Sequence, residues 1–197
     1  MSAIAKVALI GVGLAGFVSA IGWFSYQSMR GTSNSTPTGM NTDQEATLRA
    51  RGAYLMAICG CNDCHSPHDQ TGKLIAGLEF TGHHAEMPAA EWDPSMLQKG
   101  VLFAISPTGT SIAGPHGVSY AANLTPDKET GLGNLTADGL IRSWRTGMHW
   151  KEPRPILPLM PFESFANMTD DDIRAVHAFL MSLPAMRNRV PSVQISK

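Results

Sequence analysis

The sequence is poor in cysteine and almost without net charge, and both shortages exclude whole classes of protein. Three cysteines among 197 residues are too few for a scaffold held together by disulfide bonds. Lys and Arg (15) nearly balance Asp and Glu (16), so the formal net charge is −1 and no basic field favours nucleic acid. No internal repeat is present, and no apolar–polar alternation convincingly predicts β-strands. We therefore expect a mostly α-helical protein with no nucleic-acid partner.

Charged side chains are also missing from a long stretch near the N-terminus. Residues 7–24 are almost wholly apolar or small, and roughly 20 such residues in a helix cross a bilayer core. Trp23 and Tyr26 stand where an interfacial aromatic belt lies. The alternative is a cleaved signal peptide with its cleavage site at residues 18–20, but the apolar run continues beyond that site. We expect residues 1–30 to form a single uncleaved transmembrane helix.

The remainder of the chain predicts a short linker followed by one domain. Residues 31–41 are rich in Ser, Thr and Gly and lack apolar periodicity, which is typical of a flexible linker. Residues 42–184 form the expected domain, and residues 185–197 the expected C-terminal tail. Because residues 66–122 are rich in Gly and Pro and weakly periodic, we expect loops and short helices there, wrapped around a bound group.

Three threonines mark the expected helix starts. The first helix opens with a capping box at Thr42, and the other two have Thr at the capping position. The predicted helices run from Thr42 towards Ile58, from Thr136 to Gly147, and from Thr169 to Pro184. The acidic run 170–172 is either a docking patch or favourable charge at the positive end of the third helix dipole, and we favour the second interpretation.

Cys61, Cys64 and His65 form the pattern C-x-x-C-H. The two thiols of this pattern can add across the vinyl groups of haem, and the histidine is held under the iron. A structural zinc site that recruits Cys59 and His68 as well is the alternative. Zinc sites usually pair two such clusters, and no second cluster follows. Cys59 is then expected to be a small apolar side chain on the first helix.

Met160 is the expected second ligand, because prolines on both sides stiffen the loop that carries it. Several further residues of the domain could take this place from the sequence alone. The competing methionines are Met87, Met96, Met148 and Met168, and the histidines that would give bis-His ligation are His83, His84, His116 and His149. Haem propionates also need donors, and Arg142, Trp144 and Arg145 are the expected ones, although a solvated helix face would carry Arg equally well.

Taken together, these features resemble the class I cytochrome c family. The shared features are a first helix ending in C-x-x-C-H, a loop-rich middle, a Pro-flanked Met and a helix ending at Pro184. The stretch N-L-T-P-D at 123–127 is similar to the bacterial periplasmic branch that serves membrane dehydrogenases and other respiratory partners. The resemblance spans roughly residues 42–184, although residues 68–121 are poorly covered and relatives with several C-x-x-C-H motifs are not matched.

The resemblance implies a class I cytochrome c fold wrapped around one covalent haem c. Cys61 and Cys64 would be the thioether donors, and His65 and Met160 the axial ligands of the iron. Gly52 and Phe179 would lie where the first and last helices cross. With both axial positions filled, the expected chemistry is one-electron transfer, not catalysis on a small-molecule substrate.

We therefore expect a membrane-anchored monohaem electron carrier that works between membrane-bound redox complexes. Because haem is attached on the outer side of the inner membrane, the haem domain should lie in the periplasm. The alternative is a fixed cytochrome c subunit of a larger membrane oxidoreductase. A haem enzyme or gas sensor is a third class, and it would need an open position on the iron.

The uncharged N-terminal run generates the first prediction. The mature protein should stay with membranes through a high-salt wash, because burial of apolar surface is not screened by salt. The measurement is the distribution of the haem protein between membrane and supernatant before and after the wash. Mass spectrometry that finds a mature N-terminus at Ile21 would overturn the prediction.

Overall fold

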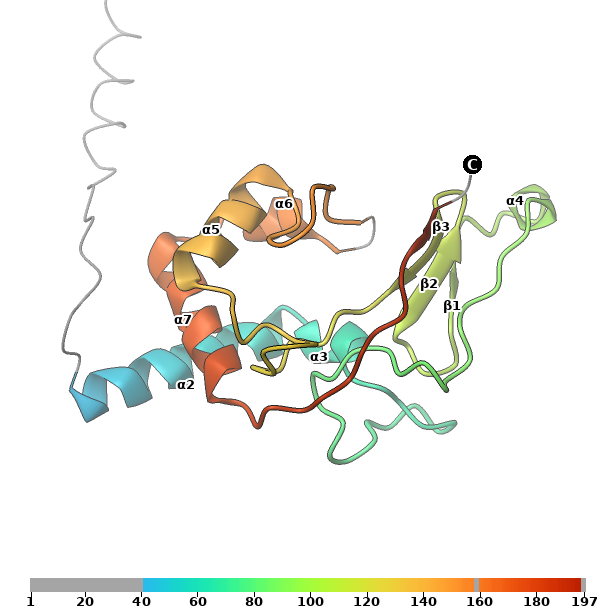
Figure 1. Ribbon diagram of the computed structural model, residues 1–197. Coiled ribbons are helices and arrows are strands. Elements are labelled where there is room, and N and C mark those ends of the chain that lie inside the picture. The colour runs from blue at the N-terminus through green and yellow to red at the C-terminus, as the bar shows by residue number, and fades with distance from the viewer. Residues whose placement is uncertain (1–40, 158–159, 196–197) are drawn as a thin grey trace, which may run out of the picture. The chain divides into compact units, whose positions relative to one another are not determined.

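Three long helices form the frame of the computed structural model, which describes residues 41–157 and 160–195 (Figure 1). They are α2 (Thr42–Ile58), α5 (Ala137–Thr146) and α7 (Asp170–Ser182). Three short helices accompany them, α3 (Cys61–His65), α4 (Ser95–Gln98) and α6 (Phe162–Phe165). Among the described residues, no helix has both the length and the apolar character needed to cross a bilayer. The anchor expected at residues 1–30 lies outside the described residues.

Side-chain caps determine where the long helices begin. At the start of α2, Asn41 Oδ1 accepts from Gln44 N at 2.9 Å and Gln44 Oε1 accepts from Asn41 N at 3.1 Å. The predicted capping box at Thr42 is therefore wrong. The observed box begins one residue earlier, at Asn41, because Asn caps a helix at least as well as Thr. The predicted caps Thr136 and Thr169 are confirmed, since each hydroxyl accepts from the backbone N–H three residues later.

Helices α2 and α7 cross in direct backbone contact at Gly52 (Figure 1). A Cβ atom at this position would overlap the carbonyl O of Ala175 and lie 2.7 Å from Cβ of Phe179. The predicted crossing at Gly52 and Phe179 is therefore confirmed. Phe80 adds an edge-to-face contact with Phe179, with ring centroids 5.9 Å apart. Only a residue without a side chain lets the two helices approach this closely.

The apolar core gathers around α7. Ile173 and Val176 of this helix are 0% and 2% exposed. The core residues contributed by the other elements are Leu55 and Met56 of α2, Leu140 and Trp144 of α5, and Phe165 of α6. Arginines support the packing at the surface, where Arg51 pairs with Asp172 at 2.9 Å and Arg145 with Asp170 at 2.6 Å. Two carboxylates of the acidic run thus bind arginines of the same chain, which supports a role within the fold.

Three strands of a four-stranded antiparallel sheet lie in the middle of the sequence, where we expected only loops and short helices, and the fourth comes from residues 194–195. The strands are β1 (Ala104–Ile105), β2 (Ser111–Gly114), β3 (Gly117–Tyr120) and β4 (Gln194–Ile195), in that order across the sheet. Gly114 pairs with Gly117 around a two-residue turn, and Gly117 has a φ of 105°. Strands of two to four residues are too short for a period of two to stand out in the sequence.

The segment after α7 packs back onto the domain instead of forming a separate tail. Strand β4 pairs with β3, and Asn188 is only 8% exposed. Its Nδ2 donates to the carbonyl O of Thr81 at 2.8 Å and to that of His83 at 3.0 Å. Residues 185–195, which we expected to form a tail, therefore hold the loop that follows α3.

The helix crossing generates the second prediction. Gly52→Ala should lower the free energy of unfolding by about 1–3 kcal/mol, the usual range for overpacking, although Ala in an exposed helix would raise it by about 0.5–1 kcal/mol. The measurement is denaturant unfolding of the haem-loaded protein. Ala50→Leu, at an exposed position of the same helix, is the control and should shift the value by less than about 0.5 kcal/mol. An unchanged or higher stability of Gly52→Ala would contradict the close crossing.

Candidate functional site

A cavity of about 380 Å³ lies between the helices and the sheet, within the range of about 300–1,000 Å³ typical of cofactor pockets. Its walls are mostly apolar, as a large apolar ligand requires. The apolar lining residues include Met56, Leu124, Leu132, Leu135, Leu140, Trp144, Phe165, Val176 and Leu180. Strands β2 and β3 contribute a second, more polar wall through Ser111, Ile112, Ser119 and Tyr120.

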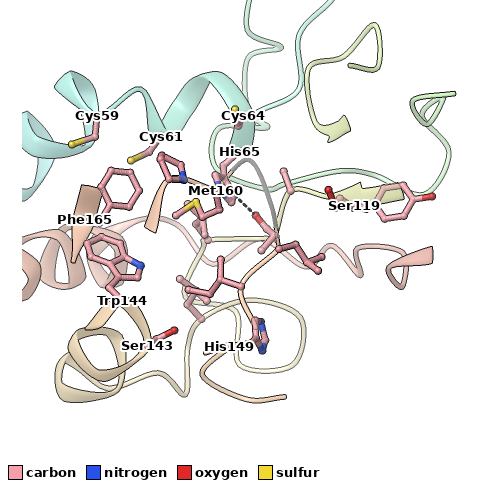
Figure 2. Close-up of a pocket in the computed structure, with 18 of the residues that line it drawn as sticks. Cys59, Cys61, Cys64, His65, Ser119, Ser143, Trp144, His149, Met160 and Phe165 are labelled. Carbon is pink, nitrogen blue, oxygen red and sulfur yellow. Dashed lines mark hydrogen bonds between the residues drawn. The ribbon is translucent and has the colours of Figure 1, made fainter. Parts of the chain in front are cut away.

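The C-x-x-C-H pattern and Met160 meet at this cavity (Figure 2). Gly60, with a φ of 65°, turns the chain between α2 and α3, and α3 then carries Cys61, Cys64 and His65 along the cavity. Met160 comes from the segment before α6, far away in the sequence. The fold therefore brings together the four residues expected to hold a haem.

A backbone carbonyl determines which nitrogen of His65 is free. His65 Nδ1 lies 2.8 Å from the carbonyl O of Ala122, and because a carbonyl can only accept, Nδ1 carries the proton. The lone pair on Nε2 is then available to a metal, which is the usual arrangement of a metal-binding histidine. Burial lowers the pKa of His65, which favours the neutral ring. The sequence did not identify Ala122, because the contact joins segments far apart in the chain.

His149 also lines the cavity, but its Nδ1 accepts hydrogen bonds, whereas Nδ1 of His65 donates one. Nδ1 of His149 accepts from the backbone N–H of Glu152 at 3.1 Å and of Lys151 at 3.4 Å. The lone pair of Nδ1 is thus occupied and Nε2 carries the proton, so His149 is arranged as a donor and not as an iron ligand. Burial lowers its pKa as well.

The remaining candidates for the second ligand lie away from the cavity. Among the described residues, Met160 lines it, whereas Met87, Met96, Met148 and Met168 do not, nor do His83, His84 and His116. Met56 is a lining residue too, but it is 3% exposed and part of the core of α2. The geometry therefore favours Met160 as the partner of His65.

The three cysteines do not assemble a metal cluster. In the part of the chain that the structure describes, no three His, Cys, Asp or Glu side chains are grouped so that they could hold a metal ion, which argues against a zinc site. Burial raises the pKa of Cys61 to about 12 and also raises that of Cys64. Before haem is attached, these shifts favour the protonated form of both thiols. Cys59 lines the cavity beside them.

The predicted propionate donors are only partly brought to the cavity. Trp144 lines it and is 8% exposed. Arg145 instead donates to the carbonyl O atoms of Ala166 and Met168 at 2.5 and 2.7 Å, so it braces α5 against the start of α7. Arg142 is exposed and is not a lining residue. Among the described residues, the arginine that lines the cavity is Arg154, which sequence reasoning missed although it lies in the segment that leads to Met160.

Comparisons with known proteins point the same way. No family model matches the chain. It is 39% identical over 154 residues to the cytochrome c subunit of a quinone-dependent alcohol dehydrogenase from Gluconobacter oxydans, covering 77% of this chain and 25% of the relative. It is 37% identical over 134 residues to the gluconate 2-dehydrogenase cytochrome c subunit of Pantoea cypripedii, covering 68% and 23%.

A third relative is one of the subunits of nicotinate dehydrogenase from Pseudomonas putida. The chain is 36% identical to it over 160 residues, which cover 81% of this chain and 10% of the relative. The chain thus spans a quarter or less of the length of these three relatives.

A thiol pair, a histidine with a free Nε2 and a thioether around one apolar cavity fit haem and define a haem protein of the c type. The relatives named above support a cytochrome c. Its cofactor is covalently bound haem c with its iron. The prediction of an electron-transfer protein is confirmed, because the relatives are named as cytochrome subunits of dehydrogenases.

The contrast between Met160 and His149 generates the third prediction. The oxidised protein should show the weak near-infrared band of Met–iron ligation, and Met160→Ala should abolish this band and lower the reduction potential, because a soft thioether ligand favours the reduced iron.

Two variants serve as controls for this measurement. Met148→Leu changes a methionine that is 43% exposed, and His149→Gln changes a cavity residue arranged as a donor; both should keep the band. If the band survives in Met160→Ala, another residue is the ligand.

Proposed function

We propose that this cytochrome c is the electron-transfer subunit of a membrane-bound dehydrogenase complex. It takes electrons from the substrate-oxidising subunit and passes them to an acceptor in the same membrane. The observation that carries the proposal is the similarity to cytochrome c subunits of alcohol and gluconate dehydrogenases. This favours a fixed subunit over the freely tethered carrier that we expected first.

The residues of the site have separate tasks in this function. His65 and Met160 would hold the iron, as the resemblance to class I cytochromes c implies. Haem c held in this way supplies one-electron redox chemistry and leaves no open position for a substrate. The Ala122 carbonyl orients His65 through Nδ1, and the apolar wall keeps water away, which disfavours the additional charge of the oxidised state.

We also propose that residues 1–30 anchor the subunit in the inner membrane, with residues 31–41 as linker and the haem domain on the periplasmic side. The uncharged, apolar run at residues 7–24 supports this arrangement. The periplasmic location of the haem domain is supported by the attachment reaction, because haem is attached covalently after export. The redox partners would then be embedded in the same membrane or docked on it.

Mild detergent extraction of the full chain tests the proposal and is the fourth prediction. The tagged protein should co-purify with a dehydrogenase subunit in a constant ratio, and its haem should be reduced when the substrate of that subunit is added. Alcohols, gluconate and nicotinate are the first substrates to test, since the relatives are named for them. Membranes with untagged protein are the control for capture.

Two outcomes separate the subunit from the free carrier. If the protein purifies without a partner subunit and none of these substrates reduces its haem, the subunit proposal is contradicted and the tethered carrier is favoured. An absorbance spectrum that shows a vacant iron position would contradict both, and would point to a haem enzyme or gas sensor.

A further inference from the structure

The segment between α5 and Met160 folds back on itself beside the cavity. Met148 and Pro155 form an antiparallel bridge, the backbone N–H of His149 donates to the carbonyl O of Arg154 at 2.9 Å, and Ile156 N donates to the carbonyl O of Gly147 at 2.7 Å. This turn brings His149 and Arg154, which are five positions apart in the chain, to one cavity.

The guanidinium of Arg154 is fixed but not saturated. Its Nε donates to Glu152 Oε2 at 2.5 Å and its Nη1 donates to the carbonyl O of Pro155 at 3.1 Å. Its Nη2 has no hydrogen-bond partner among the described residues. The side chain is 27% exposed, while that of Glu152 is 54% exposed, so Glu152 lies on the solvent side of the pair. Arg154 thus has donors left for a second anion.

His149 adds a neutral donor to the same cavity. Two backbone N–H groups occupy its Nδ1, which leaves an N–H at Nε2. In Figure 2 the labelled cysteines lie at the top of the view and His149 at the bottom, with His65 and Met160 between them. A cofactor that is attached through the cysteines and fills the cavity would therefore extend towards His149.

We propose that Arg154 and His149 bind a propionate carboxylate of the haem. Haem c carries two carboxylates on the edge away from its thioether bonds, and a carboxylate that enters an apolar cavity needs charged or N–H donors. Arg154 supplies the charge and His149 the neutral N–H, while Arg142 and Arg145 do not line the cavity. The inference rests on the proposed haem site and names the group that orients the cofactor within it.

The test compares Arg154→Gln with Arg142→Gln in the full-length, haem-loaded protein. Arg154→Gln removes a positive charge from the wall of the haem cavity, so the oxidised state becomes easier to form and the midpoint potential falls. The propionate bending bands in the resonance Raman spectrum should shift as well. Arg142→Gln removes the same charge from an exposed position of α5 and should leave both readouts as in the wild type.

A second variant removes the negative charge that pairs with Arg154. Glu152→Gln leaves Arg154 with an uncompensated positive charge, so the midpoint potential should rise. The near-infrared Met–iron band is recorded for each variant to show that the axial ligands are intact. If the band is present and Arg154→Gln behaves like Arg142→Gln, the propionate assignment fails while the electron-transfer function stands. If the wild type lacks the band, the proposed ligand pair itself fails.

Discussion

The close crossing of α2 and α7 at Gly52 is the constraint on which the site depends. Because Gly52 has no side chain, the two helices approach at backbone distance, and the end of α2 is held over the core. The chain then turns at Gly60, and α3 carries both cysteines and His65 to the cavity. A wider crossing would move these residues away from the walls formed by α5, α6 and α7.

Backbone groups, not side chains, decide the chemistry of the two histidines at the cavity. A carbonyl acceptor puts the proton of His65 on Nδ1 and leaves Nε2 to the iron. In His149, backbone N–H groups donate to Nδ1, so the proton lies on Nε2 and the ring can donate a hydrogen bond from that atom. Two identical side chains thus have different roles, because their Nδ1 atoms form hydrogen bonds with backbone groups of loops that carry no recognisable motif. This division places the ligand on one side of the cavity and the carboxylate donors on the other.

Local signals predicted local structure well. Thr136 and Thr169 cap the predicted helices, and Gly52 lies at the predicted crossing. The predictions failed where pairing is non-local. The sheet was missed because its strands are very short, and β4 reaches it from beyond α7. Arg142 and Arg145 were chosen for their place near the end of a helix, but the face of α5 that packs on the core turns them away from the cavity.

The sequence by itself determined the attachment chemistry, since C-x-x-C-H carries its thiols and its histidine within five adjacent residues. It also determined the frame of three helices, whose caps and apolar spacing are local properties. Only the tertiary structure decided which methionine shares the cavity with His65, which carbonyl orients that ring, and that Arg154 is the arginine at the cavity. These are contacts between segments far apart in the chain, and they depend on helix packing and on a sheet that no local pattern encodes.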